Sequence, residues 1–351
     1  WRFKTGAVIF DSTPAIYNNM VFIASYDGYF YAISKEGKLI WRFRTGGEIL
    51  TTPAVNNNRV FFGSRDGYAY CLDISTGSEL WRFKAGDAIA SAFTLHENRL
   101  FFGSFDSYLY CLNASNGKEI WRFKTGAEVF NVNPFPIHNN ILYFASMDSN
   151  LYAINIENGS ELWRFKTGQY GNSSAPVIAN NMLIHPSRDG FLYAISLDGK
   201  EIWRFNYGKV VSPPIVHNNR IYVGGEDSII YCLNMNGEKI WEFKPGGPIF
   251  WLSDVWNNRI FGGSWDCHLY CLSLDGKLLW RFATSSNVWA TLPPAYEAWE
   301  ADIDIKRKDY EQEEKKDKYG TVFVPTGLDE TYGIKSEYAF KSEYSSKSEY
   351  K

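Results

Sequence analysis

Residues that commonly carry out chemistry do not form a recognisable catalytic or metal-binding spacing in this chain. The histidines include no His-x-x-x-His pair of the kind that binds zinc. They are His96, His138, His185, His217 and His268. The sequence contains neither a nucleophile elbow nor a phosphate-binding glycine loop. We therefore assign no catalytic residue and no metal ligand.

The cysteines occupy a repeated place rather than a reactive one. Four of the five lie in the same motif, YCL: Cys71, Cys111, Cys232 and Cys271. Equivalent places in different repeats should lie beyond disulfide reach, so we expect small buried apolar side chains. Unpaired thiols favour a reducing compartment, and we predict a cytoplasmic location on that ground.

An aspartate precedes a tyrosine by four residues in seven places. The pairs are Asp27/Tyr31, Asp66/Tyr70, Asp106/Tyr110, Asp148/Tyr152, Asp189/Tyr193, Asp227/Tyr231 and Asp266/Tyr270. A carboxylate can act as a general base, but one in nearly every repeat predicts a structural role. We expect each aspartate to bond nearby backbone amides and to fix a turn.

The element that must position these residues is a motif of about six residues beginning with tryptophan. Its first copy is WRFKTG, residues 1–6, and successive copies are 40, 40, 40, 42, 40, 38 and 39 residues apart. The eight tryptophans are Trp1, Trp41, Trp81, Trp121, Trp163, Trp203, Trp241 and Trp280. Self-similarity at this period indicates a repeat architecture.

Each unit is predicted to contain four short strands. In the second unit these are residues 46–55, which Pro53 interrupts, then 59–64, 68–73 and 80–86. Asn-rich and Asp-Gly turns separate them, and a glycine four residues before each tryptophan from the second onward supplies a positive φ. Four strands at this period predict an all-β fold, a β-propeller of four-stranded antiparallel blades. Tryptophan and phenylalanine of the outer strand should face inward and dock one blade onto the next.

At residues 70–83, YCLDISTGSELWRF, the chain resembles the quinoprotein-type propeller repeats, often called PQQ-like repeats. The resemblance covers residues 1 to about 296 and implies tryptophan-docked blades. Redox enzymes of that family hold pyrroloquinoline quinone under two adjacent cysteines, with calcium beside it and an aspartate as base. This chain has no Cys-Cys pair, and no calcium ligand or base can be mapped onto it. We therefore predict no cofactor, with this quinone and calcium as the alternative.

The blade count depends on the two ends of the chain. Eight segments match the fourth strand of a repeat unit and eight match the first strand. Only seven segments clearly match the second strand and seven the third. We favour eight blades, the last closed by residues 1–6 as its outer strand and by 287–296 as its innermost strand. Residues 321–334 resemble the missing middle loosely. The alternative is seven blades with a spare strand.

Beyond the repeats we predict three segments. Residues 297–319 form a charged insertion, residues 320–340 are the candidate remainder of the last blade, and residues 341–351 are a flexible tail of KSEY repeats. The insertion and tail are solvated segments or partner-specific docking sites.

Chemistry in a repeat protein should lie where the repeats differ. Chain direction places the turns between second and third strands, and the linkers between blades, on one rim. The non-repeating residues of this rim and of the channel are Asp11, Arg65, Asn131, Asn133, Asn172, Arg188, Trp251, Asp254, Trp265 and Trp289. A polar funnel edged by aromatic residues is a candidate binding site, and ordered water bridging the polar groups is the alternative.

Charge and hydropathy limit the partners. A net charge of −3 disfavours a general nucleic-acid binder, and no apolar run is long enough for a transmembrane helix. Because the chain begins inside a repeat without methionine, we expect residues upstream of Trp1, and a signal peptide is one alternative for them. We predict a monomeric, non-catalytic propeller that acts as a scaffold for protein or ligand recognition, within a larger chain or alone. The alternative is a quinone-dependent dehydrogenase or a quinone-binding protein.

Overall fold

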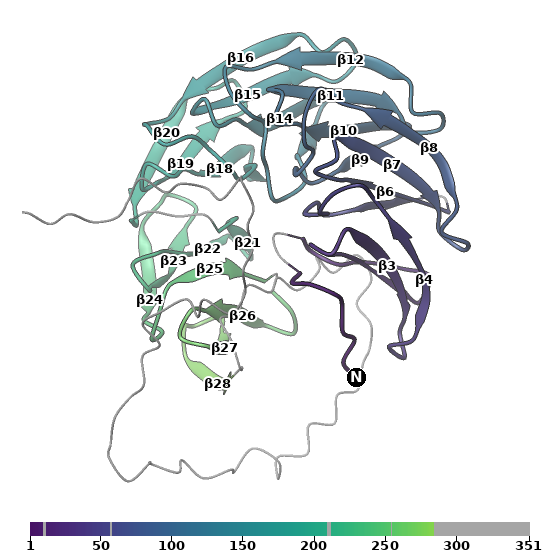
Figure 1. The fold of residues 1–351 in the computed structure, drawn as a ribbon. Helices are drawn as coiled ribbons and strands as arrows, with labels where there is room; N and C mark the ends of the chain where they lie inside the picture. Colours follow the sequence, from purple (N-terminus) through teal and green to yellow (C-terminus); the bar gives the residue numbers. More distant parts are fainter. Residues whose placement is uncertain (10–11, 57, 209–211, 254, 284–351) are drawn as a thin grey trace, which may run out of the picture. The chain divides into compact units, whose positions relative to one another are not determined.

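The computed structural model describes residues 1–283 apart from 10–11, 57, 209–211 and 254, and for Phe250 and Trp251 it describes only the backbone. These residues belong to the first of two units, Trp1–Ala298. They form seven four-stranded antiparallel sheets, each a simple meander, which confirms the predicted all-β propeller (Figure 1). In this part of the chain we find no helix of the length and apolarity that crossing a bilayer requires.

The seven sheets, blades 1 to 7, follow one another along the chain. Blade 1 contains β1 (Ala15–Tyr17), β2 (Met20–Ala24), β3 (Tyr29–Ser34) and β4 (Leu39–Arg44). Blade 2 contains β5 (Ala54–Asn56), β6 (Arg59–Gly63), β7 (Tyr68–Asp73) and β8 (Glu79–Lys84). Blade 3 contains β9 (Thr94–His96), β10 (Arg99–Gly103), β11 (Tyr108–Asn113) and β12 (Glu119–Lys124). Blade 4 contains β13 (Ile137–His138), β14 (Ile141–Ala145), β15 (Asn150–Asn155) and β16 (Glu161–Lys166).

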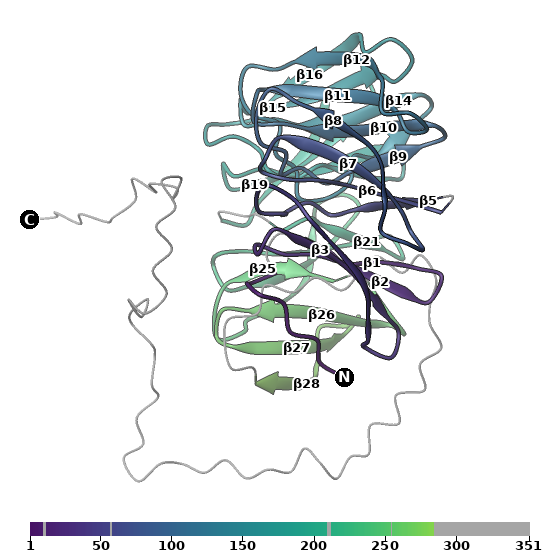
Figure 2. The same ribbon diagram turned by 45° about the vertical axis from the view of Figure 1, so that its right-hand side comes forward.

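The remaining blades have the same order of strands. Blade 5 contains β17 (Val177–Ala179), β18 (Met182–Pro186), β19 (Phe191–Ser196) and β20 (Glu201–Asn206). Blade 6 contains β21 (Ile215–His217), β22 (Arg220–Gly224), β23 (Ile230–Asn234) and β24 (Lys239–Phe243). Blade 7 contains β25 (Ile249–Leu252), β26 (Arg259–Ser264), β27 (His268–Ser273) and β28 (Leu278–Ala283). Figure 2 shows successive blades side by side, and Figure 1 shows the fourth strands, β4 to β28, on the outside.

The first strands are shorter than predicted. The sequence predicted a strand over residues 46–55, whereas β5 covers only Ala54–Asn56. Just before β5, a side chain makes the hydrogen bonds to the neighbouring strand that the backbone would make in a ladder. The Thr51 hydroxyl donates to the Gly63 carbonyl at 3.1 Å and accepts from the Gly63 amide at 3.0 Å. Asn131 bonds the backbone of Ala145 in the same way. Buried backbone groups are thus paired although the strand is interrupted.

Tryptophan docking holds neighbouring blades together, as predicted. In each of seven junctions the indole N–H donates to a backbone carbonyl of the next blade at 2.7–3.1 Å. The ring lies against the glycine of that blade's last turn, where an added Cβ would lie 2.6–2.7 Å from the indole. That glycine also has a positive φ of 70–87°. It is therefore required both for the turn and for the close approach of the indole.

The repeated aspartate joins a turn to the linker that arrives from the preceding blade. Asp106 Oδ2 accepts from the Tyr110 hydroxyl at 2.6 Å and from the Gly86 amide at 2.7 Å, and Oδ1 accepts from the Tyr108 amide. Asp–Tyr hydrogen bonds occur in all seven blades. Burial, and then the bond to Asp106, raise the pKa of Tyr110 to about 12. The structural role predicted for these aspartates is confirmed.

Replacing Tyr110 by phenylalanine is expected to lower the free energy of unfolding by about 1.5 kcal/mol, because a hydrogen bond to a partly buried carboxylate is lost. Urea denaturation followed by tryptophan fluorescence measures the change. Tyr108→Phe is the matched control: its half-buried ring lies beneath Arg122 and Lys124, and the change should cost less than about 0.5 kcal/mol. Equal costs for the two variants would contradict a specific role for the Asp106 bond.

The N-terminal segment docks as an outer strand would. Trp1 donates to the Lys35 carbonyl at 2.7 Å and lies against Gly37, as the docking tryptophans of blades 1 to 6 lie against the following blade. The segments predicted to complete an eighth blade, residues 287–296 and 321–334, lie outside the described residues, as do the predicted insertion and tail. Closure by eight blades therefore stays a prediction.

Candidate functional site

One rim of the propeller collects the positions at which the repeats differ. Each turn between second and third strands contains a Ser-x-Asp motif, with glycine in place of serine in blade 6. The middle residue of this motif changes from blade to blade, in chain order: Tyr26, Arg65, Phe105, Met147, Arg188, Glu226 and Trp265. We call this face, made by these turns and by the linkers between blades, the linker rim.

Backbone hydrogen bonds fix these variable residues in space. In blade 2 the Arg65 amide donates to the Glu48 carbonyl of the incoming linker at 2.9 Å, and in blade 3 Phe105 donates to Ala88 at 3.0 Å. Tyr26, Met147 and Trp265 are bonded to their linkers in the same way. Rigid strands and tied turns thus present side chains that are free to vary. This arrangement is typical of recognition surfaces.

Several apolar and aromatic side chains of the linker rim are exposed to solvent. Val8 is 62% exposed, Tyr170 54% and Trp265 38%. The half-buried Phe105 and Phe130 meet edge to face, with ring centroids 5.9 Å apart. Aromatic side chains that are partly exposed on a rigid frame are the residue types enriched in protein interfaces.

Two charged candidates also lie on the linker rim. Arg65 is half-buried and its Nη1 lies 3.1 Å from Glu48 Oε2, while its Nε is buried without a hydrogen-bond partner. Arg188 is half-buried at the equivalent position of blade 5. The structure thus brings Arg65, Arg188 and Trp265, three of the predicted residues, onto one face.

The three predicted asparagines lie inside the propeller and are used by the fold. Besides the Asn131 bonds described above, Asn133 accepts from the Ala175 amide at 2.9 Å and donates to the Ala175 carbonyl at 3.1 Å. Asn172 exchanges hydrogen bonds with Thr167. Because these amide groups already have protein partners, they are poorly suited as cofactor ligands.

The remaining predicted site residues cannot be placed as side chains. Asp11, Asp254 and Trp289 lie outside the described residues, and Trp251 is described only as backbone within β25. Their assignment to the channel or rim stays a prediction.

The perimeter of the propeller is solvated and largely neutralised. Arginine and lysine of the outer strands face solvent, and pairs such as Glu161–Arg164, with Nε and Oε1 2.7 Å apart, offset their charge. A β-bulge between third and fourth strands leaves an exposed aliphatic residue before each tryptophan, for example Leu80 at 48% and Leu279 at 47%. Bulges of this kind disfavour edge-to-edge pairing, so these residues have a structural explanation.

The described residues do not include the adjacent cysteines or the metal-binding cluster that the quinone enzymes use. The four YCL cysteines are buried in separate blades and unbridged, as expected, and burial raises the pKa of Cys71 and Cys111 to about 12. No group of three or more His, Cys, Asp or Glu side chains among these residues is arranged to hold a metal. The quinone-binding residues implied by the resemblance are therefore not matched here, and we derive no step through that group.

Sequence reasoning missed four buried polar groups that break the repeat. The hydroxyls of Tyr143, Tyr207 and Tyr222 and both ring nitrogens of His185 are buried without hydrogen-bond partners. Aligning the repeats would have shown His185 at the position held by Phe62, Phe102 and Phe144. Burial lowers the pKa of His185 to about 3, so its ring is neutral at physiological pH.

Comparisons with known proteins agree with this architecture. Residues 70–305 match the model of the family described as "Beta-alanine-activating enzyme, beta-propeller", and residues 1–88 match that of "Outer membrane protein assembly factor BamB". No curated protein sequence matches the chain.

Among solved structures, BamB from Moraxella catarrhalis is 16% identical, with a TM-score of 0.71 over 80% of this chain and 90% of that one. A europium-containing methanol dehydrogenase is 13% identical, with a TM-score of 0.70 over 83% and 81%. The computationally designed Ika8 protein is 18% identical, with a TM-score of 0.69 over 82% and 92%. At these identities the likeness concerns the fold alone.

Proposed function

Because this chain belongs to the family described as the β-propeller of beta-alanine-activating enzyme, we propose that it is a recognition module that binds a protein partner through its linker rim. The predicted resemblance to quinoprotein-type repeats is confirmed by the family matches and the propeller fold. The family description names a propeller that belongs to an enzyme, and BamB is by its name an assembly factor. Both descriptions fit a propeller that assists another protein, whether fused to it or separate.

The observation that carries this proposal is the contrast between repeating and non-repeating positions. Tryptophan, Asp–Tyr and glycine positions are all accounted for by blade packing. The middle residues of the seven Ser-x-Asp turns instead differ from blade to blade: five of them are held by a backbone hydrogen bond to the linker, and four are aromatic or apolar. Protein interfaces depend on a few such anchors presented on a rigid surface.

Site-specific photo-crosslinking tests the location of the interface. A benzoylphenylalanine at Trp265 or Tyr170 on the linker rim is expected to give one discrete protein adduct in the native cell. The matched control positions are Leu80 and Leu279 on the perimeter, which are similarly exposed. The same adduct from the perimeter, or no adduct from the rim, would contradict the proposal.

A further inference from the structure

The outer strand of blade 1, β4, departs from the charge pattern of the next five blades. In blades 2 to 6 the residue after the docking tryptophan forms an ion pair with the residue three positions earlier, at N···O distances of 2.6–3.7 Å. The pairs are Glu79–Arg82, Glu119–Arg122, Glu161–Arg164, Glu201–Arg204 and, with the signs exchanged, Lys239–Glu242. In blade 1 the acid is replaced by Leu39, and the exposed Arg42 forms no ion pair with a described residue.

The second base of β4 departs from the repeat as well. Blades 2, 3 and 4 have a lysine at this place, whose ammonium donates to a backbone carbonyl of the turn before the third strand at 2.5–2.7 Å. Blade 1 has Arg44, which is exposed and makes no hydrogen bond or ion pair with a described residue. Blade 7 also has a leucine instead of the acid, Leu278, but Ala283 replaces its second base. Among the described blades, blade 1 alone combines two arginines with no acid.

Tyr29 of β3 brings the two guanidiniums together. Arg42 Cζ lies 4.6 Å and Arg44 Cζ 5.6 Å from the centroid of the Tyr29 ring. Asp27, in the turn before β3, already accepts three hydrogen bonds, and the same aspartate occurs in every blade. Two like charges over one ring repel each other, and a carboxylate bound between them would offset that repulsion.

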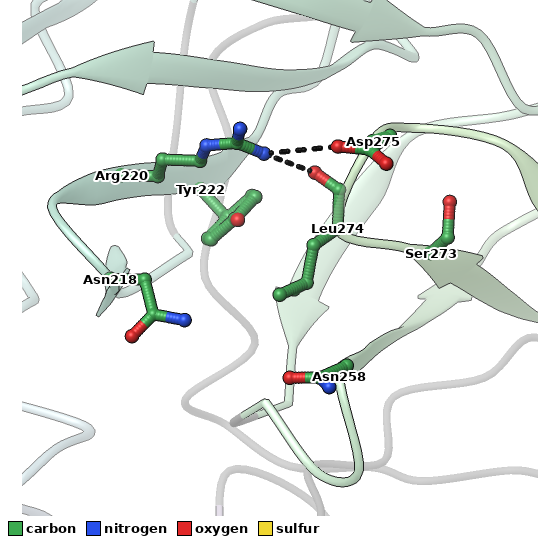
Figure 3. Close-up of a pocket in the computed structure, with 7 residues that line it drawn as sticks. All are labelled: Asn218, Arg220, Tyr222, Asn258, Ser273, Leu274 and Asp275. Carbon is green, nitrogen blue, oxygen red and sulfur yellow. Dashed lines mark hydrogen bonds and ion pairs between the residues drawn. The ribbon is translucent and has the colours of Figure 1, made fainter.

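The junction of blades 6 and 7 shows the contrast with a neutralised arginine. Arg220 Nη1 lies 3.3 Å from Asp275 Oδ1 and donates to the Leu274 carbonyl at 3.0 Å (Figure 3). An anion that approached Arg220 would therefore meet the carboxylate of Asp275. In β4 no described carboxylate forms an ion pair with either arginine, so an anion meets only positive charge.

The surroundings of the two arginines indicate the shape of the anion. Leu39 and Ile40, at the start of β4, are 46% and 45% exposed. Residues 1–6, which lie against blade 1, add two more exposed bases, Arg2 and Lys4. Single charges spread along a surface beside aliphatic side chains suit an extended segment with several carboxylates better than one phosphate group, which concentrates its charge at a point.

From the missing acid, the two guanidiniums over one ring and the exposed aliphatic residues beside them, we propose that this surface binds an acidic segment of a protein partner. We call it the β4 perimeter; it consists of Leu39, Ile40, Arg42 and Arg44. Carboxylates of the segment accept charge-assisted hydrogen bonds from the two arginines, and its apolar side chains lie against the leucine and isoleucine. The β4 perimeter is separate from the linker rim and does not depend on the function proposed for that rim.

Fluorescence polarisation with fluorescein-labelled hexaglutamate and the full chain tests this surface. We expect saturable binding at about 50 mM salt that weakens as salt is added, and no binding of hexalysine. Arg42→Gln with Arg44→Gln should weaken binding about 10-fold or more, because hydrogen bonds between charged groups are lost. The matched control is Arg122→Gln with Lys124→Gln in blade 3, which should stay within about 2-fold of the natural chain.

Leu39→Glu tests the cause of the free charge, because it introduces the acid of blades 2 to 5 on an exposed position and leaves both arginines in place. It should weaken hexaglutamate binding about 5-fold or more. Leu39→Gln removes the leucine without adding charge and should change binding less than about 2-fold. The linker-rim variant Phe105→Ser with Trp265→Ser should bind hexaglutamate as the natural chain does, which separates this surface from the linker rim.

Four outcomes would overturn the proposal. The first is no saturable binding of hexaglutamate up to about 1 mM, the weak limit of specific recognition. The second is an equal effect of the double variants of blades 1 and 3, and the third is an equal effect of Leu39→Glu and Leu39→Gln. The fourth is displacement of the labelled peptide by inorganic phosphate or by phosphatidylserine vesicles at lower concentrations than by unlabelled hexaglutamate, which would assign the arginines to phosphate groups.

Discussion

Replacing Trp121 by alanine is expected to lower the free energy of unfolding by about 3 kcal/mol or more, measured as a shift of the urea midpoint at constant slope. The indole donates to the Ile156 carbonyl of blade 4 at 3.0 Å, packs against Phe101 and covers Gly159. Its removal opens a cavity in the junction between blades 3 and 4. Since neighbouring blades depend on such contacts, the loss should also reduce cooperativity along the propeller.

Trp1→Ala is the matched control for this effect. Trp1 makes the same kind of hydrogen bond to blade 1, but the residue is 66% exposed. We expect a cost of about 1 kcal/mol from this variant. If the two substitutions cost the same, burial of the docking tryptophan would not be the main source of blade adhesion.

Acid should destabilise this propeller through His185. The ring is fully buried and burial lowers its pKa to about 3, whereas in the unfolded chain it is near 6.5. Below pH 6.5 the unfolded state takes up a proton that the folded state does not, so stability is full above pH 6.5 and falls as the pH decreases toward 3. At pH 5 the expected loss from this group is about 2 kcal/mol. Nearby Asp189 opposes the shift but does not cancel it.

His185→Phe isolates this contribution, because phenylalanine occupies the position in blades 2, 3 and 4 and stacks there on the repeated tyrosine at 5.2–5.4 Å. The variant should be at least as stable as the natural chain at pH 7.5. Its advantage should grow by about 2 kcal/mol between pH 7.5 and 5, measured by urea denaturation at each pH. A difference that does not change with pH would show that His185 does not titrate as a buried neutral ring.

The repeat made most of the fold predictable. A tryptophan every 40 residues, a glycine four residues before it and an Asp-x-x-x-Tyr spacing each correspond to one contact that recurs in every blade. Because the same contact is made many times, chance variation at one position does not hide it. The inward tryptophans, left-handed turns and buried cysteines were predictable for this reason.

Contacts made once could not be predicted in the same way. The sequence did not show that Thr51 and Asn131 replace a backbone ladder, because hydroxyl and amide side chains in a channel suit a ligand site equally well. His185 and Tyr222 differ from phenylalanine by polar atoms alone, and only the packing around them reveals that these atoms are buried without partners. The linker rim, by contrast, could be predicted from the sequence, because the order and direction of the strands determine which turns share a face.

The central claim is that function lies in the non-repeating residues of the linker rim. The most direct test compares the affinity of two double variants for the partner identified by crosslinking. Phe105→Ser with Trp265→Ser changes the linker rim, and Leu80→Ser with Leu279→Ser changes the perimeter. With both melting temperatures preserved, we expect the rim variant to bind at least about 30-fold more weakly and the perimeter variant to bind within about 3-fold of the natural chain. Equal affinities of the two variants would contradict this account.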